Sequence, residues 1–293
     1  MYFEITHKTT YRYSRPVFLE PHTIKFRPRC DGLQNLTSFD LKIEPRPAGS
    51  SDGIDLDGNI TTNVWFEGLT NTLVIQSRAK VITQYRNPFN YLLADRADRL
   101  PLSYLDPIQA YLAPYTVRQS ESHFVEQFAR HIANMTEWKT LRFLTMLTRE
   151  ISEGFQQTVR GVGAPRSAEE TYLGRVGSCR DLAILFMDAC RYVGIAARFV
   201  NGYNEDRGAG DKLSLHSWGE VYLPGVGWRG YDPSQGLAVT DRHVAIAAAV
   251  DPLLAAPASG MFRGNAVTSE FGAEIGIRAV AESEVAMPVG SAS

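Results

Sequence analysis

The chain has 293 residues, of which 44% are hydrophobic and 21% are charged, and its formal net charge is −2. This composition is that of an ordinary globular protein with one large or two medium domains, and the near-neutral charge argues against nucleic acid or an anionic membrane as a partner. The first residues lack the apolar core of a secretory signal and the longest apolar tract, residues 244–257, is too short to span a bilayer, so a cytoplasmic location is expected.

Residues 1–100 are expected to form an N-terminal β domain. Short segments rich in β-branched and aromatic residues recur between turn-forming residues, at positions 2–13, 24–27, 37–43, 63–66 and 72–77. Strands of this length and spacing predict a sandwich-like sheet domain. The sequence Asp57-Gly58-Asn59 predicts the tip of a hairpin.

Acidic residues alternate near this hairpin tip, as they do in calcium-binding loops. An EF-hand loop starting at Asp55 would need Gly at position 60 and Glu at position 66, where Ile60 and Phe66 stand. The segment is therefore interpreted as an ordinary turn, and neither a metal nor another cofactor is expected.

Residues 101–115 are expected to link this domain to a core that occupies residues 116–293. The linker lies in a stretch that is rich in Pro, Asp and Arg and lacks sustained periodicity. Two amphipathic helices are predicted next, over residues 121–134 and 139–151, and Phe124, Phe128 and Ile132 mark the apolar stripe of the first. The polar segment 155–172 is expected to form a wall of a cleft.

A third helix is predicted to begin at Cys179. The apolar residues that follow this cysteine recur at helical spacing up to Val193, and Gly194 is placed to end the helix. Ser178 is expected to be the N-cap, with Asp181 three residues later in a box-like arrangement. A thiol in the first turn of a helix feels the positive end of the helix dipole, which favours the thiolate, so Cys179 is a candidate nucleophile.

The other cysteines, Cys30 and Cys190, have no comparable setting. Three cysteines without a CxxC pair argue against a disulfide framework and against structural zinc. Cys190 falls on the apolar face of the predicted helix and is interpreted as core packing, whereas Cys30 lies in a strand or loop of the first domain.

A hairpin further along the chain supplies a candidate base and its orienting partner. With a three-residue turn after Leu223, this residue pairs with Gly227, and Asp232 then lies opposite Trp218. In that register Asp232 and His216 share one face as diagonal neighbours about 7–8 Å apart at the backbone. A slip of one residue would separate them onto opposite faces.

These motifs resemble those of the bacterial members of the transglutaminase-like superfamily. The resemblance rests on the blocks GSCRDLA, LHSWGEVYLPGVGWRGYDPSQG and DRHVAIAA, and on the N-terminal order His7, Thr9, Tyr11 and Tyr13. It implies an α+β fold in which an N-terminal β-sandwich-like domain precedes a papain-like core, with the nucleophile at a helix N-terminus packed on an antiparallel sheet. It also implies a triad.

In that triad Cys179 would attack a carbonyl, His216 would accept and return the proton, and Asp232 would hold the imidazole. The backbone N–H of Cys179 is expected to be one oxyanion donor, and Gln157 is the candidate for the second.

Two further residues of this region are placed by their position in the predicted strands. Trp218 shares the His216 face and is expected near the substrate cleft. His243 is expected to be a structural residue beside the site.

The predicted function is acyl transfer from a carboxamide or peptide carbonyl through a thioester, on a protein or peptide substrate. Hydrolysis by a cysteine protease or amidase is slightly preferred over cross-linking to an amine. A non-catalytic peptide-binding module is one alternative. An enzyme like the arylamine acetyltransferases is another, although no basic, Gly-rich segment suits the phosphates of an acyl-CoA.

The C-terminal part and the assembly are less constrained. Residues 271–285 alternate weakly and are expected to be closing strands of the core, and residues 287–293 are expected to fray. The oligomeric state is left open.

Overall fold

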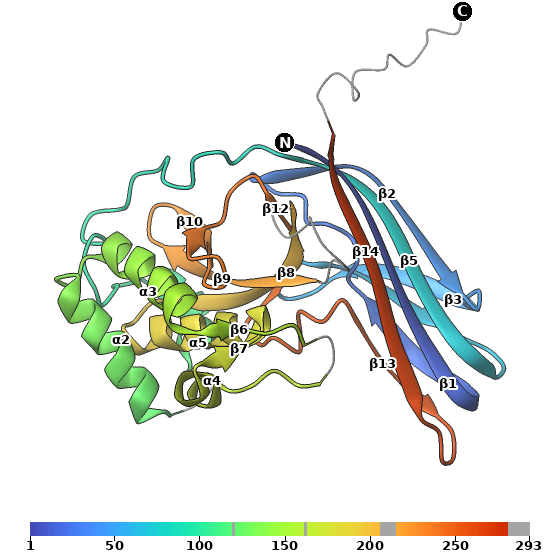
Figure 1. Ribbon diagram of the computed structural model, residues 1–293. Helices are drawn as coiled ribbons and strands as arrows, with labels where there is room; N and C mark the ends of the chain where they lie inside the picture. Colours follow the sequence, from blue (N-terminus) through green and yellow to red (C-terminus); the bar gives the residue numbers. More distant parts are fainter. Residues whose placement is uncertain (119–120, 161–162, 206–214, 281–293) are drawn as a thin grey trace, which may run out of the picture.

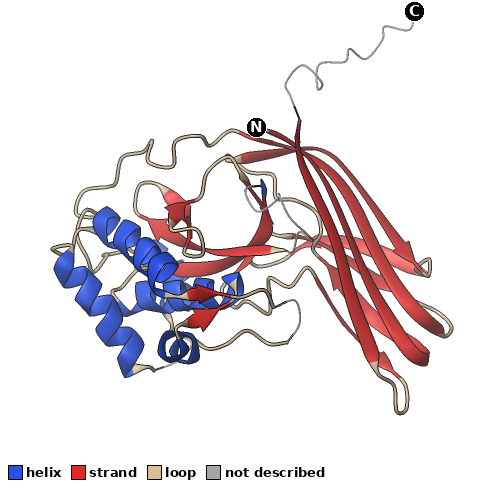
Figure 2. Cartoon of the chain, viewed as in Figure 1, coloured by secondary structure: helices blue, strands red, loops and turns tan. Residues whose placement is uncertain are grey.

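The computed structural model describes residues 1–118, 121–160, 163–205 and 215–280 of the protein. A sheet-rich N-terminal region stands beside a core of helices and a second sheet (Figures 1 and 2). The predicted α+β fold is confirmed in both parts. Among the described residues, no helix combines the length and the apolar character that a membrane span requires.

The N-terminal sheet is organised around one strand of 23 residues, β1 (Tyr2–Ile24). Its residues from Tyr2 to Val17 pair with β5 (Thr70–Thr83), with a shift in register between Arg12 and Val17, and its last residues, from His22 to Ile24, pair with β4 (Ile60–Trp65). The edges are β2 (Gln34–Glu44), beside β5, and β3 (Gly49–Ile54), beside β4. Apolar residues of both halves, including Val17, Val64 and Ile75, pack into one cluster, which accounts for the predicted sandwich-like character.

The last strands join this sheet rather than the core. Both β13 (Ala258–Arg263) and β14 (Ser269–Val280) pair antiparallel with β1, and β14 runs alongside its first half (Figure 1). The expectation that these strands close the core is therefore wrong. Alternation along a strand indicates which face is buried but does not identify the neighbouring strand. Residues 281–285, and the predicted frayed end 287–293, lie outside the described residues.

The predicted linker is ordered against the core. It contains most of α1 (Ile108–Thr116), and Leu102 just before this helix is buried. The Tyr104 hydroxyl accepts a hydrogen bond from the backbone N–H of Ala196 at 2.8 Å and donates one to the carbonyl of Tyr222 at 3.1 Å. These contacts attach the segment to the core sheet.

The core sheet is antiparallel, in the order β11-β10-β9-β8-β12. Its strands are β8 (Ala197–Asn204), β9 (His216–Leu223), β10 (Gly227–Asp232), β11 (Leu237–Ala238) and β12 (His243–Ala249). The helices gather on the side of this sheet away from the N-terminal strands (Figure 2). They are α2 (His123–Met135), α3 (Thr140–Gly154), α4 (Ala168–Gly174) and α5 (Cys179–Tyr192).

Two of these helices, α2 and α3, confirm the helices predicted in this region. The stripe predicted for α2 is rotated by one residue, because Phe124 is 45% exposed while Val125 and Ala129 are buried. The short helix α4 was not predicted, and a capping box formed by Ser167 and Glu170 starts it.

The central helix of the core is α5. Every residue from Asp181 to Arg191 is buried, so the helix is covered on all sides rather than along one stripe. It ends as predicted at Gly194, whose φ is +81°. A Cβ atom at this glycine would lie 2.8 Å from the Cβ of Pro101, so the close approach of the linker also requires glycine.

The N-terminal region docks on the core by covering the edge of β12. The Gln34 amide donates to the carbonyl of Ala245 and accepts from its N–H, both at 2.8 Å. The Asn59 amide likewise donates to the carbonyl of Ala248 at 2.6 Å and accepts from its N–H at 2.8 Å. Two side chains thus take the place of a further strand and satisfy backbone groups that an edge would leave unpaired.

Replacing Asn59 with leucine is expected to lower the free energy of unfolding by roughly 2–4 kcal/mol, because the buried N–H and C=O of Ala248 would both lose their partner. Urea unfolding measures this effect. The control is Asn71→Leu, at an exposed residue of β5, which should change stability by less than about 0.5 kcal/mol. Equal losses in both variants would contradict the docking role.

Candidate active site

Cys179 is the first residue of α5, as predicted, and its surroundings fix the start of this helix. One carboxylate oxygen of Asp181 accepts hydrogen bonds from the backbone N–H and the hydroxyl of Ser178, each at 2.8 Å. The other oxygen accepts from the Arg160 guanidinium at 2.7 Å and from the backbone N–H of Arg166 at 2.8 Å. The thiol is therefore held at the positive end of the most deeply buried helix of the core.

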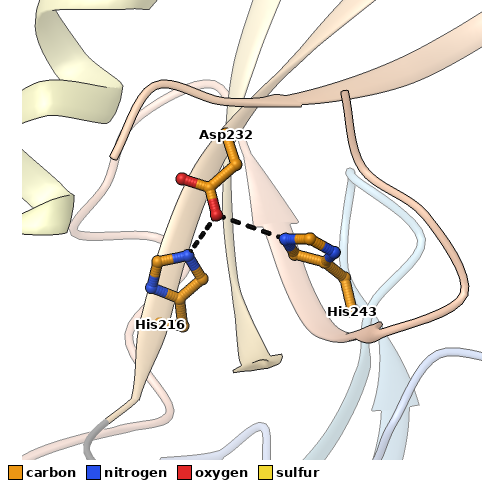
Figure 3. A group of neighbouring side chains, drawn as sticks. All are labelled: His216, Asp232 and His243. Carbon is orange, nitrogen blue, oxygen red and sulfur yellow. Dashed lines mark hydrogen bonds and ion pairs between the residues drawn. The ribbon is translucent and has the colours of Figure 1, made fainter. Parts of the chain in front are cut away.

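The β9–β10 hairpin has the predicted register. Leu223 pairs with Gly227, and the pairing continues to Gly219 and Tyr231. This register brings the end of β10 beside the start of β9, where Nε2 of His216 and Oδ2 of Asp232 lie 2.5 Å apart (Figure 3). Both side chains are buried.

The Asp232 carboxylate is held from several sides. Its Oδ1 accepts from the backbone N–H of Ser234 at 2.9 Å and from the Ser234 hydroxyl at 2.7 Å. Its Oδ2 lies 3.2 Å from Nε2 of His243 in addition to the bond with His216 (Figure 3). Burial alone would raise the pKa of this carboxyl, but the two imidazoles lower its pKa well below the usual range, so the group is ionised at neutral pH.

The imidazole of His216 is the counterpart of this carboxylate. Burial opposes its charged form, but Asp232 and, after it, Cys179 outweigh burial and raise the pKa of His216 to about 9. The second ring nitrogen, Nδ1, has no hydrogen-bond partner of normal geometry among the described residues, and the sulfur of Cys179 is the neighbour that interacts with this ring. At neutral pH the imidazole is therefore protonated, beside the sulfur of Cys179.

His243 contacts the site and confirms the expectation of a structural neighbour. Its ring lies at 5.3 Å from the ring of Trp218, centroid to centroid, in an edge-on arrangement. Trp218 lies near the site as expected, but it is only 1% exposed and packs behind the two imidazoles. It is not among the described residues that line the neighbouring cavity, so its assignment to the substrate cleft is corrected.

Gln157, the candidate second oxyanion donor, lies across from Gly177 in the short parallel pair of β6 (Gln156–Gln157) and β7 (Val176–Gly177). Its amide nitrogen donates to the carbonyl of Ser234, next to the Asp232 loop. To serve an oxyanion this amide would have to leave that partner, so the role stays a prediction.

Cys179 opens onto a cavity of about 740 Å³. Segments of the core around the nucleophile form one wall, and β1 and β14 form the opposite wall. Sequence reasoning missed this contribution of the N-terminal region. The alternation of His7, Thr9 and Tyr11, which places them on one face of a strand, was the available signal.

The cluster of His216, Asp232 and His243 also has the composition of a metal site, with ligand atoms within 4.8 Å of one another. Two ligands of one tetrahedral zinc ion, each at about 2.1 Å, would lie about 3.4 Å apart. The 2.5 Å separation between His216 and Asp232 is instead that of a short charge-assisted hydrogen bond. The donor atoms therefore fit a proton-handling site better than a metal site.

Comparison with known proteins identifies two matching regions. Residues 3–82 match the bacterial transglutaminase-like N-terminal region, and residues 123–233 match the transglutaminase-like superfamily. An uncharacterized protein of Mycobacterium tuberculosis is 26% identical over 286 residues, covering 91% of this chain and 89% of that protein. One of Mycobacterium leprae is 24% identical over 284 residues, covering 90% and 94%.

Among solved structures, a protein of Cytophaga hutchinsonii proposed to be a cysteine protease has the same overall fold. The two align with a TM-score of 0.70 at 21% sequence identity, over 96% of this chain and 92% of that chain. The alignment therefore includes both the N-terminal sheet and the core.

Proposed function

This chain belongs to the transglutaminase-like superfamily, and from that premise we propose that it is a thiol acyl-transfer enzyme acting on carboxamide or peptide carbonyls. The observation that carries the proposal is the buried hydrogen bond between His216 and Asp232, next to a cysteine at a helix N-terminus. Each group has the environment that its role requires. The carboxylate is ionised, the imidazole is protonated, and the sulfur faces a cavity large enough for a substrate.

The first half of the reaction makes the acyl-enzyme. The Cys179 thiolate attacks the substrate carbonyl, and the oxyanion that forms is stabilised by N–H groups in the first turn of α5, which have no partner within the helix. His216 then gives its proton to the leaving nitrogen, so that the carbon–nitrogen bond breaks and ammonia or an amine departs. A thioester remains on Cys179, and His216 is neutral.

The second half returns the enzyme to its starting state. The neutral His216 accepts a proton from water or from an amine as that group attacks the thioester, and the bond to sulfur breaks. The thiolate and the imidazolium are then restored. Asp232 holds the ring in one orientation throughout and stabilises its positive charge.

We favour water as the acceptor, so that the protein would be a cysteine protease or amidase. The same fold occurs in the Cytophaga hutchinsonii protein proposed to be a cysteine protease, which supports this choice. The same triad would serve cross-linking to a lysine or small amine, because the chemistry differs only in the group that attacks the thioester.

The test is incubation with a short glutamine-containing peptide, with and without a primary amine. Hydrolysis predicts either release of ammonia with conversion of glutamine to glutamate, or cleavage of a peptide bond, whether or not the amine is present. An amine adduct would show cross-linking instead. Absence of any turnover, together with slow alkylation of Cys179 by iodoacetamide, would favour a non-catalytic binding module. Acetylation of an arylamine by acetyl-CoA would favour the acetyltransferase-like alternative.

A cytoplasmic location completes the proposal. Fractionation of cells that produce the tagged chain tests it, because recovery in the periplasmic or membrane fraction would contradict it.

A further inference from the structure

The wall of the cavity opposite Cys179 is one face of the N-terminal sheet. Three cross-strand pairs of β1 and β14 contribute to it, and each pair joins two odd-numbered residues that share this face. The pairs are His7 with Ile275, Thr9 with Ala273, and Tyr11 with Phe271. The first strand of the chain and its last described strand together face the nucleophile.

This wall presents no charge to the cavity. His7 is its one titratable imidazole, and burial lowers the pKa of His7 to about 3, so the ring is neutral. One ring nitrogen lies 2.9 Å from the Tyr203 hydroxyl and the other 3.1 Å from the Thr9 hydroxyl, which uses both nitrogens within the protein. The ring also stacks on Phe26 at 4.1 Å. The imidazole of His7 and the hydroxyl of Thr9 are therefore already paired.

The centre of the wall is hollowed. Ala273 is small and exposed, and it lines the cavity on the same face as the larger residues Phe271 and Ile275. Around this hollow lie exposed apolar side chains from three separate segments. These are Val159, Leu253 and Phe271, which are 86%, 68% and 43% exposed.

Exposed apolar residues that gather around one concavity mark a binding surface. Because Cys179 lies in the same cavity, whatever fills it has to bring a carbonyl to the sulfur. We propose that the hollow between β1 and β14 binds a bulky apolar side chain, such as leucine or phenylalanine, of the peptide acyl donor, close to its reacting carbonyl. This inference rests on the proposed acyl transfer and names the substrate class of that site.

The test uses a matched pair of variants on β14. Ala273→Phe fills the hollow, whereas Ala279→Phe adds the same side chain on the same face at an exposed position that does not line the cavity. The substrates are short glutamine peptides in which one leucine is moved through the positions near the glutamine, each compared with its serine counterpart. The leucine-to-serine ratio of kcat/KM is measured for each position.

Wild type is expected to prefer leucine by about tenfold or more at one position. Ala273→Phe should reduce that ratio at least tenfold, while Ala279→Phe keeps the ratio and leaves the serine peptides within about twofold of wild type. An unchanged ratio in Ala273→Phe would overturn the inference, and so would a wild type without a preference.

Protection of Cys179 from iodoacetamide by the same peptides gives a second readout that needs no turnover. Suppose that no turnover is seen, that the leucine peptide protects Cys179, and that Ala273→Phe abolishes this protection. The proposed binding of the side chain would then be supported, while the proposed acyl transfer would fail. If turnover is present but leucine and serine peptides protect Cys179 equally, the proposed side-chain binding site is overturned and the proposed acyl transfer stands. Dimerisation of the wild type that Ala273→Phe prevents would show that a second copy covers this surface, and this result would also overturn the inference.

Discussion

Replacing Cys179 with alanine is expected to lower kcat/KM for a glutamine peptide by a factor on the order of 10⁴ or more, because no other group can form the thioester. Alanine keeps the first residue of α5 helical and removes only the sulfur, and the bonds that hold the helix start come from Asp181. The urea unfolding midpoint should therefore stay near that of wild type.

The control for this variant is Cys30→Ala. Cys30 is exposed in the N-terminal region, so the same atom is removed away from the triad, and turnover should stay within about twofold of wild type. Retention of activity within tenfold in Cys179→Ala would rule out this cysteine as the nucleophile. Cys190 offers no replacement, because it is buried and burial raises the pKa of its thiol well above the ordinary value.

Replacing Asp232 with asparagine is expected to lower kcat by about 10²–10⁴ and to change the pH profile. In wild type the pKa of His216 is raised to about 9, so the imidazolium that protonates the leaving group persists until the pH exceeds this value. Asparagine removes the carboxylate that counteracts the effect of burial on the pKa of His216, and this pKa should then fall. The alkaline limb of kcat/KM, near pH 9 in wild type, should move to lower pH.

The pH dependence of the free energy of unfolding should depend on the same two groups, His216 and Asp232. The raised pKa of His216 contributes stability that is fully present below its ordinary pKa of about 6.5 and is lost as the pH rises through about 9. The lowered pKa of Asp232 contributes stability that is present above its ordinary pKa of about 3.9 and is lost at lower pH. Asp232→Asn should therefore lose most stability at about pH 4 to 6.5, and the loss should shrink as the pH rises to about 9, as measured by urea unfolding across the range.

The matched control is Asp98→Asn, which removes a carboxylate paired with Lys139 at the surface. It should leave the alkaline limb unchanged, and also the pH dependence of unfolding above about pH 5, because the lowered pKa of Asp98 acts only at more acidic pH. If Asp232→Asn retains the wild-type alkaline limb, the carboxylate does not set the charge of His216.

The parts of the site that sequence predicted are those that local rules determine. The length of the turn after Leu223 fixes the register of the hairpin, and this register places Asp232 beside His216. Helical periodicity and the cap at Ser178 place Cys179 at a helix start. Each inference spans fewer than twenty residues, over which backbone geometry leaves few alternatives.

The parts that sequence missed depend on contacts between distant segments. The pairing of β14 with β1 joins the two ends of the chain, and strand alternation does not specify a partner. Trp218 was placed on the correct face, but its depth depends on neighbours such as Gly202, where a Cβ would lie 2.6 Å from the indole ring. In the sequence Gln34 and Asn59 look like ordinary polar residues, and their role is visible only in the fold, where their amides bond to the backbone of β12.

Mass spectrometry of the intact protein, quenched with acid during turnover of a glutamine peptide, tests the central claim most directly. A covalent adduct on Cys179, absent from Cys179→Ala, is the predicted result, with the mass of the peptide less ammonia or, where a peptide bond is cleaved, the mass of the acyl fragment. Turnover that proceeds equally in wild type and Cys179→Ala, with no adduct on the cysteine, would contradict the account.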